Sequence, residues 1–202
     1  LQANSILLSA AEDLHFLPWS WNRPNPLELP LLATWLQNSL SSPEQDERAV
    51  ATFSLIALVA GRSLRRALDI ALDSVPGQEW TLDIKGKRLL RMPPRRVPGW
   101  APDDQDSSSW IAPMAEVCIL PLPDSAANFL LELEAGINEP RSLGELWNST
   151  WGDSPESAFL KAMQTTLPRL SPAMLGNALA QHAYLQTGDG VFARLLASHP
   201  RT

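Results

Sequence analysis

Hydrophobic residues recur every three to four positions over residues 30–72 and 123–187, which is the spacing of helices that bury one face. Between these regions, over residues 79–92 and 115–122, apolar and polar residues alternate or form a short apolar run, as strands do. The sequence therefore predicts a mainly helical α+β domain, with a small antiparallel sheet of about three strands packed among helices.

Three helices are predicted in the N-terminal part of the chain. The first covers residues 30–40 and has proline in its first turn. The second has Ser42 as its cap and Pro43 at its first position, and it ends at Gly61. The third covers residues 63–72. The residues expected to face the core are Leu32, Trp35, Leu36, Leu64, Leu68 and Ile70.

The strands are predicted to form a hairpin and a separate third strand. Residues 79–84 alternate between polar and apolar side chains, as in a half-buried strand. Lys85 and Gly86 are expected to make a tight turn into the second strand. Residues 115–122 are predicted to form the third strand, in which Cys118 is buried and inert.

The C-terminal part of the chain is predicted to be helical again. A helix is expected over residues 123–136, between cap residues and a closing glycine. Ser154 and Ser171 are each followed by proline, which indicates that they cap two further helices. Asp189 is expected to cap a last helix that ends at about Ala197.

The composition indicates a folded domain. Of 202 residues, 45% are hydrophobic and 19% are charged, which is enough apolar material for one sizeable core. No apolar run approaches the ~20 residues that cross a bilayer, and the single cysteine excludes an internal disulfide framework. We therefore expect a cytoplasmic protein with no membrane partner. No His/Cys cluster indicates a zinc site, and no metal or cofactor is expected.

Prolines and tryptophans gather near the N-terminus, where proline favours irregular or extended backbone. We divide the chain into a Pro/Trp-rich wrap with a helix, residues 1–42, and a single compact unit, residues 43–202. Trp19, Trp21 and Trp35 are interpreted as covering the domain's own core, and a partner-binding surface is the alternative. The sequence begins with leucine and stops abruptly, so we expect it to be a segment of a longer protein.

Four stretches carry a recognisable order of motifs. They are LIALVAGRSLRRALDIALDSV, WTLDIKGKRLLRMP, AEVCILPLPDSAANFLLEL and RLSPAMLGNALAQHAYLQTGDGVFARLLASH. Together they resemble the catalytic domain of the tyrosine recombinases, also called the phage integrase family. In order they match its arginine-bearing helix, its hairpin with a lysine at the turn, its strand before a Leu-Pro-capped helix, and its His-x-x-Arg and Gly-His motifs. The resemblance covers roughly residues 45–199 and implies a tyrosine-recombinase-like fold.

The resemblance also implies a reaction. In this family a tyrosine attacks a DNA phosphodiester and becomes covalently joined to it. Two arginines hold the non-bridging oxygens in the transition state, and a hairpin lysine or a histidine supplies the proton to the leaving 5′ oxygen. Removing one such positioned donor costs ~3–4 kcal/mol.

The positions of the two arginines hold neutral residues in this chain. The first arginine falls on Ser63, and a slip of one residue would place Arg62 there. The later motif places the family's histidine, arginine and second histidine on Ala173, Gly176 and Asn177. The resemblance therefore implies a catalytic centre that has been erased.

The end of the family pattern is incomplete as well. The Gly-His motif falls on Ala197 and Ser198, with His199 one step late, and the nucleophile would come about ten residues further on. Tyr184, the sole tyrosine, lies upstream and is interpreted as a packing residue. The possible catalytic remnants are Arg62, Lys85, Lys87 and His199.

Positive charge is concentrated in one part of an acidic chain. Nine of the 16 lysines and arginines lie within residues 62–96, whereas the net charge is −6. In the family this hairpin faces DNA, so a retained basic patch is expected to contact phosphates. The alternative is a solvated hairpin whose cations pair with the acids in residues 103–106. The predicted DNA contacts are Arg62, Arg65, Arg66, Lys85, Lys87, Arg88, Arg91, Arg95 and Arg96.

We therefore predict a catalytically degenerate, tyrosine-recombinase-like protein, a pseudoenzyme rather than an enzyme. Its expected role is accessory or regulatory DNA binding in site-specific recombination or DNA integration, in a bacterium or a mobile element. Its partner would be duplex DNA, or a recombinase or another protein. Two alternatives remain open: a protein-interaction module on the same scaffold without DNA binding, and an active strand-exchange enzyme whose nucleophile lies outside this segment.

Overall fold

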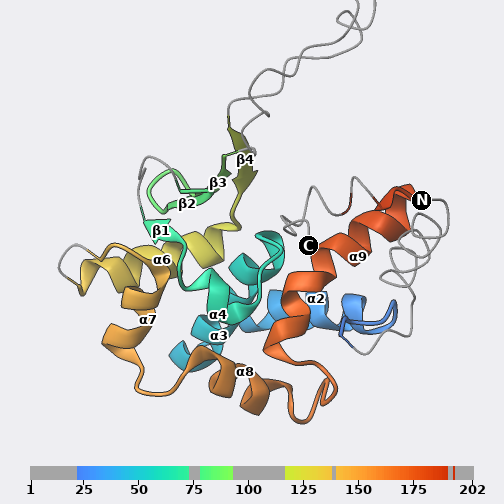
Figure 1. Cartoon of the computed structure of the whole chain (residues 1–202). Helices are drawn as coiled ribbons and strands as arrows, with labels where there is room; N and C mark the ends of the chain where they lie inside the picture. The colour runs from blue at the N-terminus through green and yellow to red at the C-terminus, as the bar shows by residue number, and fades with distance from the viewer. Residues whose placement is uncertain (1–21, 73–77, 93–116, 138–139, 191–192, 194–202) are drawn as a thin grey trace, which may run out of the picture.

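The computed structural model describes residues 22–72, 78–92, 117–137, 140–190 and 193, which form seven α-helices and a four-stranded mixed sheet (Figure 1). The helices are α2 (Glu28–Ser39), α3 (Gln45–Val59), α4 (Leu64–Ala67), α6 (Asp124–Ala135), α7 (Leu143–Thr150), α8 (Pro155–Met163) and α9 (Leu175–Thr187), with a 3-10 turn η1 (Pro172–Met174) before α9. The strands are β1 (Ala71–Leu72), β2 (Trp80–Asp83), β3 (Arg88–Arg91) and β4 (Cys118–Pro121). The predicted mainly helical α+β class is confirmed.

The prediction of about three antiparallel strands is wrong, because a fourth strand, β1, pairs parallel to β2. The sequence predicts a helix over residues 63–72, but α4 ends at Ala67. The residues after α4 instead form backbone hydrogen bonds with the segment before α7. The N–H of Leu72 donates to the carbonyl of Arg141 at 2.9 Å. This long-range pairing overrides the local helical pattern.

Helix α3 is the centre of the helical layer and contacts α2, α4, α6, α8 and α9. Its mostly apolar surface accounts for this position, because a helix that is apolar nearly all round is buried nearly all round. Phe53 on α3 meets the ring of Trp147 on α7 edge-on, with centroids 5.1 Å apart. None of the described helices is long and apolar enough to span a membrane.

Helices α2 and α3 begin at residues other than those predicted. Helix α3 begins at Gln45, and the hydroxyl of Ser42 accepts from the N–H of Glu44 instead of capping the helix. Helix α2 begins two residues earlier than predicted, because Asn25 and Glu28 form a capping box: each side chain accepts from the backbone N–H of the other. The predicted end of α3 is confirmed, since Gly61 has a φ of 62°, which favours glycine.

The sheet differs from the predicted burial pattern at two places. Strand β2 is not half-buried: Trp80, Thr81 and Leu82 are all buried. Cys118 is exposed and lies on β4, one of the two outer strands of the described sheet. The predicted burial of this thiol is therefore wrong.

The N-terminal tryptophans are described only in part. Trp35 on α2 packs edge-on against Phe159 of α8, with ring centroids 6.3 Å apart, and it adjoins the main core. This agrees with the interpretation that it covers the domain's own core. Trp19 and Trp21 lie outside the described residues.

The two serine-proline caps are not equivalent in the structure. The hydroxyl of Ser154 accepts from the N–H of Ser157 at 3.2 Å and caps α8, whereas Ser171 makes no side-chain cap bond before η1. We expect Ser154→Ala to lower the free energy of unfolding by about 1 kcal/mol, because it leaves a helix N–H without its protein acceptor. Ser171→Ala is the matched control and should change stability little. Chemical denaturation of both variants tests this, and equal losses would contradict it.

Candidate nucleic-acid interface

Ser63 and Gly176 hold the positions that the resemblance assigns to the two arginines, and the structure brings them into direct contact. Ser63 caps α4, and Gly176 lies in the first turn of α9. A Cβ atom added to Gly176 would lie 2.8 Å from the backbone nitrogen of Ser63 and 2.9 Å from the carbonyl carbon of Arg62. The backbone of residues 62–63 therefore fills the space in which a side chain at residue 176 would begin.

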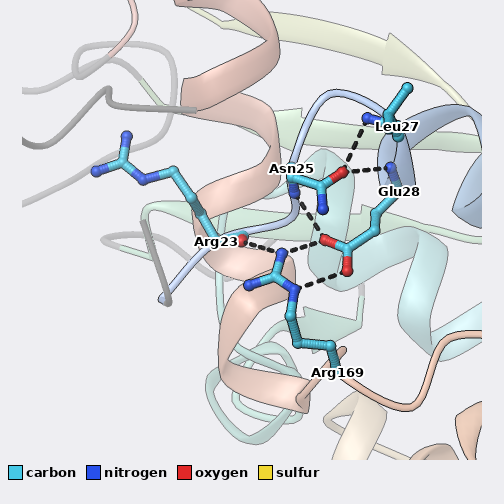
Figure 2. Close-up of polar contacts among 5 residues, drawn as sticks. All are labelled: Arg23, Asn25, Leu27, Glu28 and Arg169. Carbon is cyan, nitrogen blue, oxygen red and sulfur yellow. Dashed lines mark hydrogen bonds and ion pairs between the residues drawn. The ribbon is translucent and has the colours of Figure 1, made fainter. Parts of the chain in front are cut away.

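The rest of the later motif is tied to the N-terminal segment. The side-chain amide of Asn177 donates to the carbonyl of Asn22 at 2.7 Å. Arg169, in the loop before η1, donates to the carbonyl of Arg23 at 3.0 Å and forms a two-pronged ion pair with Glu28 (Figure 2). We call these contacts between residues 22–28 and residues 169–177 the N-terminal clamp.

The contacts of the N-terminal clamp favour the ionised forms of Glu28 and Arg169. Hydrogen bonds from Arg169 hold the pKa of Glu28 below its usual range, against the opposing effect of burial, and the backbone N–H of Asn25 adds to the lowering. The same pairing raises the pKa of Arg169. The side chain of Arg23 points away from the pair, while its carbonyl faces Arg169 (Figure 2).

A second charged group lies at the open end of the β2–β3 hairpin. Arg62, directly after α3, donates from Nη2 to Oε2 of Glu79 at 2.8 Å. Arg91, at the end of β3, places its Nε 3.6 Å from Oε1 of the same carboxylate, and its guanidinium lies over the ring of Trp80 at 5.2 Å. Arg62 and Arg91 therefore share the carboxylate of Glu79.

Two of the cations near the hairpin turn, Lys87 and Arg88, form ion pairs with acids. The Nζ of Lys87 donates to Asp124 at the start of α6 at 2.6 Å, and the Nε of Arg88 donates to Asp83 at 2.7 Å. Asp83 also accepts from the N–H of Gly86, which closes the turn, and this backbone bond is the main reason that the pKa of Asp83 is lowered. Of the acids, Asp124 is highly exposed, so its ion pair is easily opened by solvent.

The structure separates the hairpin lysines from Arg62, the other predicted remnant among the described residues. Trp80 pairs with Arg91 and Asp83 with Arg88, so the turn that carries Lys85 and Lys87 lies at the opposite end of the strands from Arg91. Four-residue strands span about 10 Å. The described hairpin therefore groups Arg62 with Arg91, and not with either lysine.

Three predicted contacts are exposed and form no ion pair with a described residue. They are Arg65 and Arg66 on α4, and Lys85 at the hairpin turn. Arg95, Arg96 and His199 lie outside the described residues, as do the acids of residues 103–106.

Tyr184 is half-buried on α9 and packs against a small alanine cluster. Within the described ranges, no group of three His, Cys, Asp or Glu side chains is arranged to hold a metal ion.

Sequence reasoning missed Glu79, Glu28 and Arg169, which organise the two charged groups. The spacing Asn25-x-x-Glu28 is a capping-box signal that was available in the sequence. Nothing in the local pattern marks Glu79 or Arg169, because their partners lie 17 and 141 residues away.

Comparison with protein-family models, with curated proteins and with solved structures finds no match for this chain. The family resemblance therefore rests on the order and spacing of the motifs in this sequence.

Proposed function

We propose that this protein is a catalytically silent, tyrosine-recombinase-like domain that binds duplex DNA in an accessory or regulatory role. The contact between Ser63 and Gly176 carries the catalytic part of this proposal. It joins the two positions assigned to the family's arginines, and neither residue supplies a cation. Without these donors, transition-state charge on a scissile phosphate lacks the two guanidinium groups that the family places at these positions.

The charge distribution supports the DNA-binding part. Residues 62–91 contain seven lysines and arginines against four acids, in a chain whose net charge is −6. Arg65, Arg66 and Lys85 are exposed in this segment, so they can meet phosphates without first breaking an ion pair to a described residue. Cations of this kind bind the DNA backbone irrespective of its sequence.

The double variant Arg65→Ala/Arg66→Ala tests DNA binding. We expect its affinity for a duplex at low salt to fall about tenfold or more, and the slope of log affinity against log salt to become shallower by about 2, because two phosphate contacts are lost. Fluorescence anisotropy with a labelled duplex measures both quantities.

Arg141→Ala/Lys161→Ala is the matched control, since it removes two exposed cations outside the segment. Equal losses in the two double variants would show that only net charge matters, and no binding by the unchanged protein would contradict the proposal. Covalent trapping of the protein on a nicked suicide substrate would instead support the alternative of an active strand-exchange enzyme.

One observation favours the alternative of a protein-interaction module. Strand β4 is one of the two outer strands of the described sheet, it carries no charged residue, and Ile119 on it is 56% exposed. Uncharged exposed strands are places where another strand can pair. If duplex DNA is not bound at low salt, this alternative becomes the better account.

A further inference from the structure

The two outer strands of the described sheet differ in how their free sides are covered. Strand β1 is two residues long, Ala71 on it forms a bridge with Ser142, and the N–H of Leu72 donates to the carbonyl of Arg141. Strand β4 is four residues long and borders only β3 in the described sheet (Figure 1). Of the two outer strands, β4 is therefore the one that can accept a further strand.

The backbone of β4 directs its hydrogen-bonding groups alternately toward β3 and away from it, as in any antiparallel pair. The N–H of Leu122, directly after β4, donates to the carbonyl of Lys87 at 2.9 Å, which fixes this alternation. The backbone groups of Ile119 and Pro121 therefore face away from β3. Because proline has no N–H, Ile119 is the only residue within β4 that offers both a donor and an acceptor on this side.

The side chains of β4 are suited to an uncharged strand. Ile119 is 56% exposed, and Cys118 and Pro121 are exposed as well. None of the four residues of β4 is charged, so neither an acidic nor a basic strand finds an opposite charge on it. Edge strands that must stay unpaired commonly carry a lysine or an inward-pointing charge, and β4 has neither.

A second copy of the chain supplies a strand that meets these conditions. In an antiparallel pair of β4 strands related by a two-fold axis, Ile119 lies opposite the same residue of the second copy, and each N–H donates to the other carbonyl. The two isoleucine side chains then lie on one face of the sheet and cover each other. Pro121 lies at the end of the strand, so the central pair does not need its missing N–H. We propose that two copies of this protein associate through antiparallel pairing of their β4 strands, centred on Ile119.

Charge and size determine how strong this dimer is. Each copy has a net charge of −6, so two copies repel each other and approach best where their surfaces are uncharged. Strands of four residues span about 10 Å, so the shared surface is much smaller than the roughly 800 Å² per partner of a standard interface. We therefore expect a dissociation constant weaker than about 10 µM.

Sedimentation equilibrium combined with amide hydrogen exchange tests the proposal. A reducing agent is present throughout, because the exposed Cys118 could otherwise join two copies by a disulfide. We expect dimers to form as the protein concentration is raised to about 1 mM, and the Ile119 amide to gain protection in parallel. The amide of Leu122, which is already bonded within the chain, should change little.

The variant Ile119→Lys should weaken the dimer, because a lysine on an edge strand discourages pairing. We expect its dissociation constant to rise about tenfold or more. Leu31→Lys is the matched control, since Leu31 on α2 is 53% exposed and the same charge is introduced there. It should leave the dissociation constant within about twofold of the unchanged protein. Both variants have the same net charge, so a loss confined to Ile119→Lys is not an effect of repulsion between copies.

Three results would overturn the proposal. They are a protein that stays monomeric at about 1 mM, equal losses in Ile119→Lys and Leu31→Lys, and a dimer in which the Ile119 amide gains no protection. If Ile119→Lys fails to fold, the concentration dependence of Ile119 protection in the unchanged protein decides the question.

The dimer does not depend on the proposed DNA binding, and the two can fail separately. If the unchanged protein dimerises through β4 but binds no duplex at low salt, the strand pairing stands and DNA binding fails. If it binds duplex DNA while the Ile119 amide stays unprotected at every protein concentration, DNA binding stands and the dimer is wrong.

Discussion

Replacing Gly176 with arginine, the residue that the family resemblance assigns to this position, is expected to destabilise the fold rather than restore strand cleavage. The first side-chain atom would lie 2.8 Å and 2.9 Å from backbone atoms of Ser63 and Arg62, which cannot rotate away as a side chain can. Helix α9 and the turn after α3 would have to separate. We expect a loss of about 3 kcal/mol or more in the free energy of unfolding.

A graded series makes this result interpretable. Gly176→Ala adds only the clashing methyl group and should cost about 1–2 kcal/mol, because overpacking outweighs the gain in helix propensity. Gly152→Ala is the matched control, since a Cβ there meets nothing within 4 Å. Urea denaturation compares the three variants. A Gly176→Arg protein that is as stable as the unchanged protein would contradict the close contact, and would leave room for a catalytic arginine.

Removing one partner of the N-terminal clamp is expected to have the second largest effect. Arg169→Met leaves the carboxylate of Glu28, whose side chain is 12% exposed, without its main partner. An uncompensated charge in a mostly buried position costs more than the ion pair itself contributes. We expect a loss of about 2 kcal/mol, measured by chemical denaturation at neutral pH. Lys161→Met breaks an exposed pair with Asp153 and should have no measurable effect.

The clamp should also make stability depend on pH. Because the pKa of Glu28 is lowered in the folded protein, the contribution of Glu28 to stability is complete above its ordinary pKa of about 4.5 and is lost as the pH falls through the folded pKa. Part of the acid destabilisation should therefore disappear in Glu28→Gln. If the two proteins lose stability in parallel between neutral and acidic pH, Glu28 is not held by the clamp.

Local patterns predicted the helices that have strong caps or wide apolar faces. The helix over residues 123–136 ends at Gly136 as predicted, and α8 begins with Ser154 and Pro155 as predicted. The place of the hairpin and its turn are also as predicted, because turn residues are local signals, whereas the predicted half-burial of β2 is wrong. Strand β1 was missed because its partners, β2 and Arg141, are distant in the sequence.

The site was less predictable than the fold. The count of lysines and arginines located a basic segment. It did not show which of these side chains are paired with acids. Arg62, Lys87 and Arg88 are held by Glu79, Asp124 and Asp83, whereas Arg65 and Arg66 are exposed on α4 without an acidic partner among the described residues. Such pairings depend on side chains that only the folded chain brings together.

The N-terminal clamp has a consequence for biosynthesis. Glu28 and Arg169 are separated by 141 residues, so a ribosome that adds 5–20 residues per second synthesises them roughly 7–30 s apart. Until Arg169 emerges, the carboxylate of Glu28 lacks its guanidinium partner. We expect the nascent N-terminal region to stay accessible to proteases and chaperones through most of translation, and to become protected only when the loop before η1 has left the exit tunnel.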